Sequence, residues 1–105
     1  MEKLIPIDYA NPERPTVSGR ELHKFLEVGA DYRHWFPRMV EYGFEEGKDF
    51  NPVKIDRVQD EGGRKVTRMV DDHQLTIPMA KELCMLQRNE RGKLARKYFL
   101  AVEEQ

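Results

Sequence analysis

The spacing of apolar residues over the first quarter of the chain predicts two short strands and a helix. An apolar run at residues 4–7 ends in a cluster of turn-forming residues, and Pro6 makes it an edge strand because proline lacks the amide that a central strand needs. A second extended stretch covers residues 15–17. Ser18 then begins a capping box, and apolar residues at helical spacing predict a helix over about residues 19–27.

A second helix is predicted after a break at residues 28–30. Asp31 is a good N-cap for a helix that runs to about Tyr42, with apolar residues at helical spacing on its buried side. Pro37 lies inside this pattern, and proline removes one helical hydrogen bond, so we expect a kink or a looser first turn. Gly43 follows as a residue typical of a helix C-terminus.

The middle of the chain predicts a β-hairpin. Two runs rich in β-branched residues, at about residues 53–58 and 66–70, flank the glycine pair at 62–63, which is typical of a tight turn. Val58 and Met69 break the alternation of apolar and polar positions in these runs. We therefore expect a bulge or an early end to one of the strands.

The last third of the chain predicts two consecutive helices. Thr76 is a good cap for a helix that begins at Ile77, and Pro78 is tolerated there because the first-turn amides have no helical partner. Asn89 is the next capping residue, and apolar residues at helical spacing define a last helix over about residues 90–103.

This order of elements predicts an α+β fold, with about four helices segregated from a small antiparallel hairpin or sheet. The first two helices and the hairpin follow the order of a helix-turn-helix with a wing-like hairpin, a style of nucleic-acid-binding domain. At 105 residues the chain has room for one core, so we expect residues 1–105 to be a single domain. The predicted last helix runs almost to the end, so a stand-alone domain and the N-terminal part of a longer protein are both open.

The composition is that of a folded domain with a heavily solvated surface. Hydrophobic residues make up 39% and charged residues 35% of the chain, and no apolar run is long enough for a membrane helix or a signal peptide. The single cysteine, Cys84, excludes an internal disulfide and fits a reducing compartment. We therefore expect a cytoplasmic protein that does not bind a membrane.

The chain offers no recognisable catalytic, cofactor-binding or metal-binding motif. Its three histidines lack the spacing of a zinc site, and neither a nucleophile elbow nor a glycine-rich phosphate loop is present. Cys84 lies on an apolar helix face and is interpreted as a small core residue. The acidic pair at 71–72 precedes a helix and is interpreted as complementing the dipole of that helix. We expect a non-enzymatic protein without a cofactor or metal.

Basic residues gather in the second half of the chain, although the net charge of the whole is −1. Residues 1–53 carry seven Lys and Arg against ten Asp and Glu, whereas residues 54–97 carry eleven against seven. The candidate nucleic-acid or partner-binding residues in the hairpin and the last helices are Arg64, Lys65, Arg68, Arg88, Arg91, Lys93, Arg96 and Lys97. If the hairpin tip and the last helix face the same way, these residues form one positive surface for phosphates; a solvated helix face is an equally good interpretation.

The second predicted helix offers another candidate surface. In a DNA-reading helix, the residues on the outer side would meet base edges. The residues interpreted as lying on that side here are Tyr32, Arg33, His34 and Arg38. Acidic residues surround the same element and would repel phosphate, so a protein-docking surface is an equal alternative.

Two stretches of the chain carry a recognisable order and spacing of residues. The first runs from Val17 to Val28 and is followed by the aromatic pair at 35–36. The second contains the segments LTIPMAKELCM, RNERGK and ARKYF within residues 75–99. Over about residues 16–103 this pattern resembles the AntA/AntB antirepressor family of phages and prophages, with the Bro-N and KilA-N domains as more distant relatives.

The resemblance implies a phage or prophage regulator, without catalytic residues, that acts in the cytoplasm of the bacterial host. It would relieve lysogenic repression by binding a repressor protein and so favour lytic growth. The near-neutral net charge favours this interpretation over a dedicated DNA-binding domain. The alternative is a transcriptional regulator that binds double-stranded DNA through the basic hairpin and last-helix surface.

We expect the apolar residues late in the chain to exceed what a small core can bury. The residues predicted to leave an apolar stripe are Leu86, Leu94, Tyr98 and Val102. Such a stripe would suit a two-fold contact between two copies, so we expect a homodimer.

Overall fold

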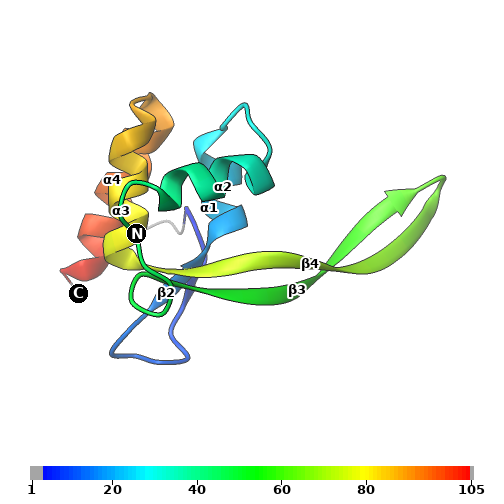
Figure 1. Cartoon of the computed structure of the whole chain (residues 1–105), viewed down its shortest axis with the longest axis horizontal. Helices are drawn as coiled ribbons and strands as arrows, with labels where there is room; N and C mark the ends of the chain where they lie inside the picture. The colour runs from blue at the N-terminus through cyan, green and yellow to red at the C-terminus, as the bar shows by residue number, and fades with distance from the viewer. Residues whose placement is uncertain (1–3, 105) are drawn as a thin grey trace.

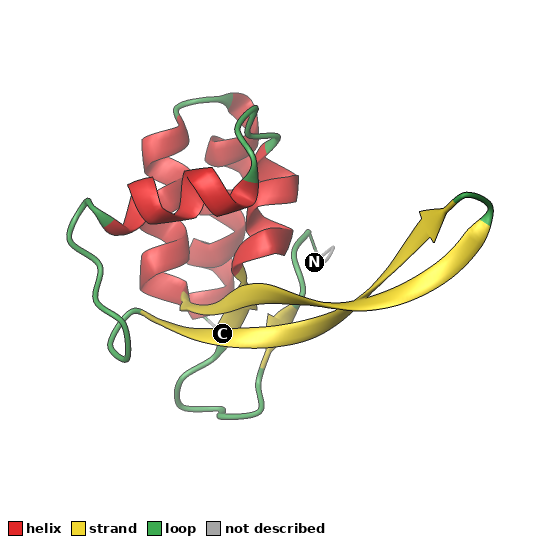
Figure 2. Cartoon of the chain, turned by 45° about the vertical axis from the view of Figure 1, so that its right-hand side comes forward, coloured by secondary structure: helices red, strands yellow, loops and turns green. Residues whose placement is uncertain are grey.

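The computed structural model describes residues 4–104, which contain four helices and four strands. The elements are β1 (Ile7–Asp8), β2 (Thr16–Ser18), α1 (Gly19–Leu26), α2 (Tyr32–Val40), β3 (Phe50–Glu61), β4 (Arg64–Thr76), α3 (Ile77–Gln87) and α4 (Glu90–Glu103). The strands form one antiparallel sheet in the order β1-β2-β4-β3, so the fold is α+β as predicted. The helices form a body at the base of β3 and β4, and the outer part of these two strands projects from it as a long arm (Figures 1 and 2).

Three of the four helices begin at a capping residue that the local sequence predicts. The side-chain oxygens of Ser18, Thr76 and Asn89 each accept a hydrogen bond from the amide three residues later, as predicted. Asp31 stands at the N-cap of α2, but its side chain makes no cap bond there. α2 contains Pro37 and ends three residues after it. None of the helices within residues 4–104 has the length and apolar composition needed to cross a bilayer.

The hairpin is longer and more regular than the sequence predicts. β3 and β4 pair without interruption over the whole length of β3, so the expected bulge or early strand end is wrong. The two turn glycines have φ angles of 58° and 82°, as a mirror-image two-residue turn requires. Val58 and Met69 interrupt the alternation because they lie in solvent, with exposed fractions of 62% and 61%. An arm that water reaches on both faces needs no strictly apolar face.

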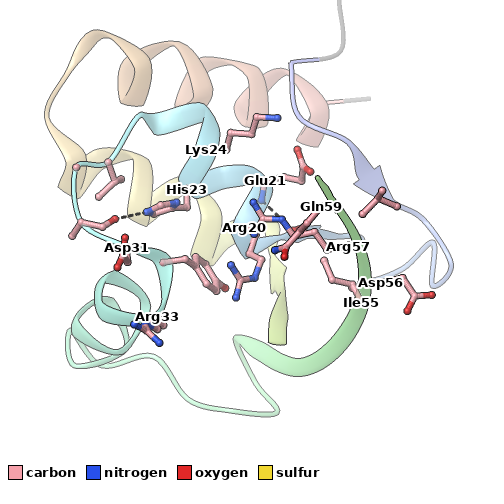
Figure 3. Close-up of a pocket in the computed structure, with 16 residues that line it drawn as sticks. Arg20, Glu21, His23, Lys24, Asp31, Arg33, Ile55, Asp56, Arg57 and Gln59 are labelled. Atoms are coloured by element: carbon pink, nitrogen blue, oxygen red, sulfur yellow. Dashed lines mark hydrogen bonds between the residues drawn. The ribbon is translucent and has the colours of Figure 1, made fainter. Parts of the chain in front are cut away.

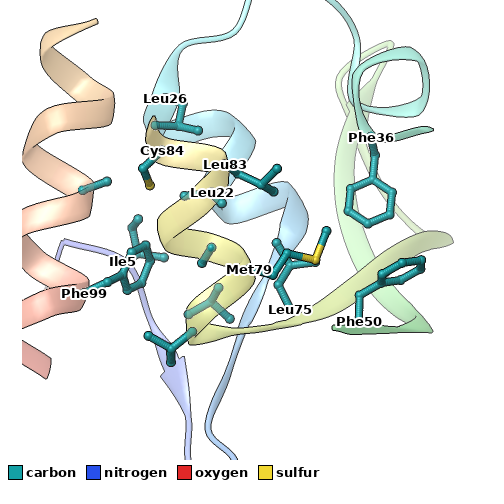
Figure 4. Packing of buried hydrophobic residues seen from close by; sticks show 14 of the residues in the cluster. Ile5, Leu22, Leu26, Phe36, Phe50, Leu75, Met79, Leu83, Cys84 and Phe99 are labelled. Atoms are coloured by element: carbon teal, nitrogen blue, oxygen red, sulfur yellow. The ribbon is translucent and has the colours of Figure 1, made fainter. Parts of the chain in front are cut away.

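The core lies where α1, α3 and α4 meet each other and the ends of β2 and β4 (Figure 4). Its fully buried side chains include Leu22 from α1, Leu75 from β4, Met79 from α3 and Phe99 from α4. Cys84 is buried among them, as predicted. Burial raises the pKa of its thiol to about 12, so the thiol is not a nucleophile at neutral pH.

The apolar stripe predicted late in the chain, in α3 and α4, is divided between the core and the surface. Tyr98 is buried and donates a hydrogen bond from its hydroxyl to the Ile5 carbonyl at 3.1 Å, and Val102 packs against the core. Leu86 and Leu94 are 37% and 45% exposed. A two-fold contact between copies stays a prediction, with fewer apolar residues to support it than the sequence indicated.

Candidate functional site

Basic residues gather at the junction of α3 and α4, which we name the α3–α4 corner: Arg88, Arg91, Lys93, Arg96 and Lys97. Arg88 closes α3 in the left-handed conformation, with a φ of 50°, and Asn89 caps α4. A Cβ atom at Gly92 would lie only 2.5 Å from the Cys84 carbonyl oxygen. Glycine therefore allows the two helices to approach closely at the corner.

Arg91 differs from the other cations of the corner because it is bound within the molecule. Its Nε donates to the Phe25 carbonyl at 2.8 Å, its guanidinium lies 4.0 Å from the centroid of the Phe25 ring, and the Glu27 carboxylate is 3.9 Å away. These contacts tie the end of α1 to the corner. The exposed cations that remain are Arg88, Lys93, Arg96 and Lys97. Three of them line a shallow groove of about 490 Å³.

The basic residues of the hairpin lie at the other end of the molecule. Arg64 and Lys65 follow the turn at the tip, while Arg68 is held by Glu61 through two hydrogen bonds of 2.9 and 2.8 Å. The tip points away from the helical body, and α4 lies on the far side of that body (Figure 1). The structure therefore does not bring the hairpin tip and the last helix together into one positive surface.

Three of the four residues predicted on the outer side of α2 are exposed: Arg33, His34 and Arg38. Tyr32 is buried, so its predicted position on the outer side is wrong. Its ring stacks on Phe36 at a centroid distance of 5.5 Å, and its hydroxyl lies 2.7 Å from Nδ1 of His73. Burial is the main reason that the pKa of His73 is lowered and that of Tyr32 is raised, so both groups are neutral at pH 7.

A polar network that sequence reasoning missed fixes the base of the arm on α1. Asp72 is 2% exposed, and its carboxylate accepts from the Ser18 hydroxyl at 2.5 Å and from the Arg20 amide at 3.0 Å. Arg20 also donates from Nε to the Asp71 carbonyl at 2.5 Å, and its guanidinium lies over the Tyr32 ring at 4.7 Å. Asp72 therefore complements the N-terminus of α1, and the expectation that the acidic pair serves the following helix is wrong for this residue.

A groove lies between the arm and the helical body, and we name it the arm groove (Figure 3). Its volume is about 1050 Å³, and it is bounded by α1, the turn after α1, the start of α2 and residues 55–59 of β3. The charged side chains that line it are Arg20, Glu21, Lys24, Asp31, Arg33, Asp56 and Arg57. Within residues 4–104 no cluster of His, Cys, Asp and Glu could hold a metal ion. The mixture of signs makes the groove suited to a polar polypeptide rather than to a polyphosphate.

The chain matches the model of a known protein family. The family is described as AntA/AntB antirepressor, and the match covers residues 17–89, from β2 through α3 to the cap of α4. The matched part includes the polar network, the arm and the arm groove. No curated protein and no solved structure matches the chain. Because the match spans well over half of its residues, the chain belongs to the AntA/AntB antirepressor family.

Proposed function

We propose that this chain is a phage antirepressor that relieves lysogenic repression by binding a repressor protein. The observation that carries the proposal is the family match over residues 17–89. The charge distribution supports a protein as the partner, because the two basic clusters lie at opposite ends of the molecule and the arm groove carries both signs. A dedicated DNA-binding face has its basic residues along one side.

The α3–α4 corner is the surface proposed for the repressor. Its four exposed cations stand near apolar side chains that are also exposed, namely Met85 at the end of α3 and Leu94 in α4. The acidic Glu90 lines the same groove, but the cations outnumber it there. Exposed apolar side chains beside a net charge are typical of a protein interface, in which the charge steers a complementary partner. We infer that the repressor presents an acidic surface to the corner.

Charge reversal at the corner tests this proposal, with the repressor encoded by the same phage as the probe. The chain is expected to bind that repressor at micromolar concentrations or below in titration calorimetry. The double variant Arg96→Glu, Lys97→Glu is expected to weaken binding by about ten-fold or more, which corresponds to about 1.4 kcal/mol. The reason is that the reversed charges repel the acidic surface of the partner.

The matched control is the double variant Arg38→Glu, Lys48→Glu, which changes the net charge equally but lies outside both the corner and the arm groove. Its affinity is expected to stay within about two-fold of the parent chain, since long-range attraction is screened by salt. Equal losses in the two double variants would exclude the corner. The absence of any complex at micromolar concentrations would exclude the repressor as the partner.

Binding of double-stranded DNA is the second candidate function. The observation that favours it is the arm, a projecting two-stranded ribbon with Arg64 and Lys65 near its tip, since the major groove of B-DNA is about 12 Å wide and admits such a ribbon. The order of helix, helix and hairpin is also that of a winged helix-turn-helix. On this alternative, binding to an operator duplex weakens as the salt concentration rises. The double variant Arg64→Ala, Lys65→Ala is expected to lower the slope of log K against log salt concentration by about two. A lack of duplex binding at low salt excludes it.

A further inference from the structure

One edge of β3 has no strand beside it. β3 is the outermost strand of the sheet, and in a hairpin with a two-residue turn the residues that flank the turn form a hydrogen-bonded pair. Odd-numbered residues of β3 therefore bond to β4, and the backbone groups of even-numbered residues point outward. Two bonds agree with this assignment: the Asp49 carbonyl accepts from the Thr76 amide across the ladder, and the Phe50 carbonyl accepts from the Gly47 amide on the outer side.

The outward backbone groups of the arm have no hydrogen-bond partner within residues 4–104. They belong to Lys54, Asp56, Val58 and Asp60. The start of the same edge is already covered by the chain itself, because Glu46 forms an isolated parallel bridge with Phe50. Beyond that bridge the edge presents alternating donors and acceptors, which is a template for pairing with another polypeptide.

The twist of the arm turns this edge toward the helical body. The two strands cross between base and tip, so the outer part of β3 lies on the side of the helices (Figures 1 and 2). Residues 55–59 of β3 form one wall of the arm groove. The product of the rise per residue, the spacing between strands and the spacing between sheets is the volume that one residue of an extended chain occupies, ~160 Å³. The groove of about 1050 Å³ therefore has room for about six residues, which is one short strand.

We propose that the arm groove binds an extended segment of the repressor as a strand added to the free edge of β3. The inference rests on the proposed function, since it names the part of the repressor that is held and how. The backbone groups of Asp56 and Val58 form the hydrogen bonds, and the charged walls of the groove contact the side chains of the segment. The side chains of the groove therefore select the sequence of the segment, while the backbone hydrogen bonds of β3 hold it in place.

The chemistry of the edge favours a polypeptide segment over the other occupants. A nucleic-acid backbone offers phosphate acceptors, which match the outward amides but not the outward carbonyls. The carboxylates of Glu21, Asp31 and Asp56 line the groove beside its cations and repel phosphate. A second copy of this chain carries its own helical body beside the same edge of β3 (Figure 1), and a groove sized for about six extended residues leaves no space for that body.

Proline substitution tests the edge, because at an outward position it removes an amide that makes no bond to the neighbouring strand. Val58→Pro removes the outward amide of a residue that lines the arm groove, and Thr67→Pro removes the equivalent amide on the opposite edge of the same cross-strand pair. We expect Val58→Pro to weaken binding of the phage repressor by about ten-fold or more in titration calorimetry, and Thr67→Pro to stay within about two-fold. Val58→Ala keeps the amide and is expected to bind like the parent chain.

Amide hydrogen exchange, followed by NMR, gives a second readout on the unmodified chain. In the complex the amides of Asp56 and Val58 are expected to exchange at least about ten-fold more slowly, whereas those of Ile55 and Arg57, already bonded to β4, change little. Circular dichroism reports whether both proline variants keep their fold. If both proline variants lose binding equally, the hydrogen-exchange measurement on the unmodified chain decides whether the edge of β3 is the binding site.

The outcomes separate this inference from the function on which it rests. Selective loss in Val58→Pro, together with slowed exchange at the even-numbered positions, supports the added strand. Binding that survives Val58→Pro, or unchanged exchange at those positions in the complex, overturns it and leaves repressor binding intact. A parent chain that does not bind the repressor overturns the proposed function, and the inference falls with it.

Discussion

The Asp72→Ala variant is expected to unfold at a markedly lower temperature than the parent chain. The substitution removes the acceptor of two hydrogen bonds in a buried site, and a bond to a charged group contributes about 1.5–3 kcal/mol, so the free energy of unfolding should fall by about 3 kcal/mol. In a domain of this size each 1 kcal/mol shifts the melting temperature by roughly 4–8 °C, which gives a fall of roughly 12–24 °C. Thermal melts followed by circular dichroism measure it.

Asp71→Ala is the matched control for this prediction. Asp71 is the neighbouring acidic residue, but it is exposed, and its ion pair with Lys54 at 2.9 Å lies in solvent, where such pairs contribute little. Its melting temperature should stay close to that of the parent chain. Asp72→Asn keeps one acceptor oxygen and should melt between the two. Similar melting temperatures for the two alanine variants would mean that Asp72 does not anchor the arm.

The Gly92→Ala variant is expected to have a free energy of unfolding about 2–3 kcal/mol lower than the parent chain, because the added methyl group overpacks a close contact. The added Cβ would lie 2.5 Å from the Cys84 carbonyl oxygen and 3.4 Å from Oδ1 of Asn89. A backbone oxygen cannot rotate away as a side chain can, so α3 and α4 must move apart at the corner. Denaturant titration gives the loss, and amide chemical shifts should change mainly around residues 84–92.

Gly29→Ala provides the comparison for Gly92→Ala. Gly29 lies in the turn between α1 and α2, and no atom lies within 4 Å of a Cβ built there. The substitution should be neutral or stabilise the chain by about 0.4–1 kcal/mol, because alanine restricts the unfolded state. If Gly92→Ala were as stable as Gly29→Ala, the corner would have more freedom than the close contact implies.

The parts of the fold that the sequence predicts well are those set by local chemistry. Ser18, Thr76 and Asn89 carry oxygens that can reach an amide three residues later, so the starts of three helices follow from neighbouring residues alone. The two-residue glycine turn of the hairpin has the same local origin. The family resemblance follows the order of these segments, and the family match agrees with it.

The parts that the sequence does not predict depend on residues far apart in the chain. Tyr32 looks like a surface residue at the start of a helix, but Arg20 from α1 and His73 from β4 lie against its ring and help to bury it. Asp72 meets Ser18 and Arg20 across 54 and 52 residues, a distance at which periodicity carries no information. The arm groove arises from the twist of two paired strands, so no motif in the sequence marks it.

The unbroken pairing of β3 with β4 restricts how the arm can change in length as the family diverges. Adding one residue to each strand would turn every side chain beyond the insertion to the opposite face of the ribbon. Adding two residues to each strand would restore the faces and carry the tip outward by about 6.6 Å. Homologous arms are therefore expected to lengthen or shorten in such paired steps, which keeps the side chains of the tip in the same orientation while its reach is adjusted.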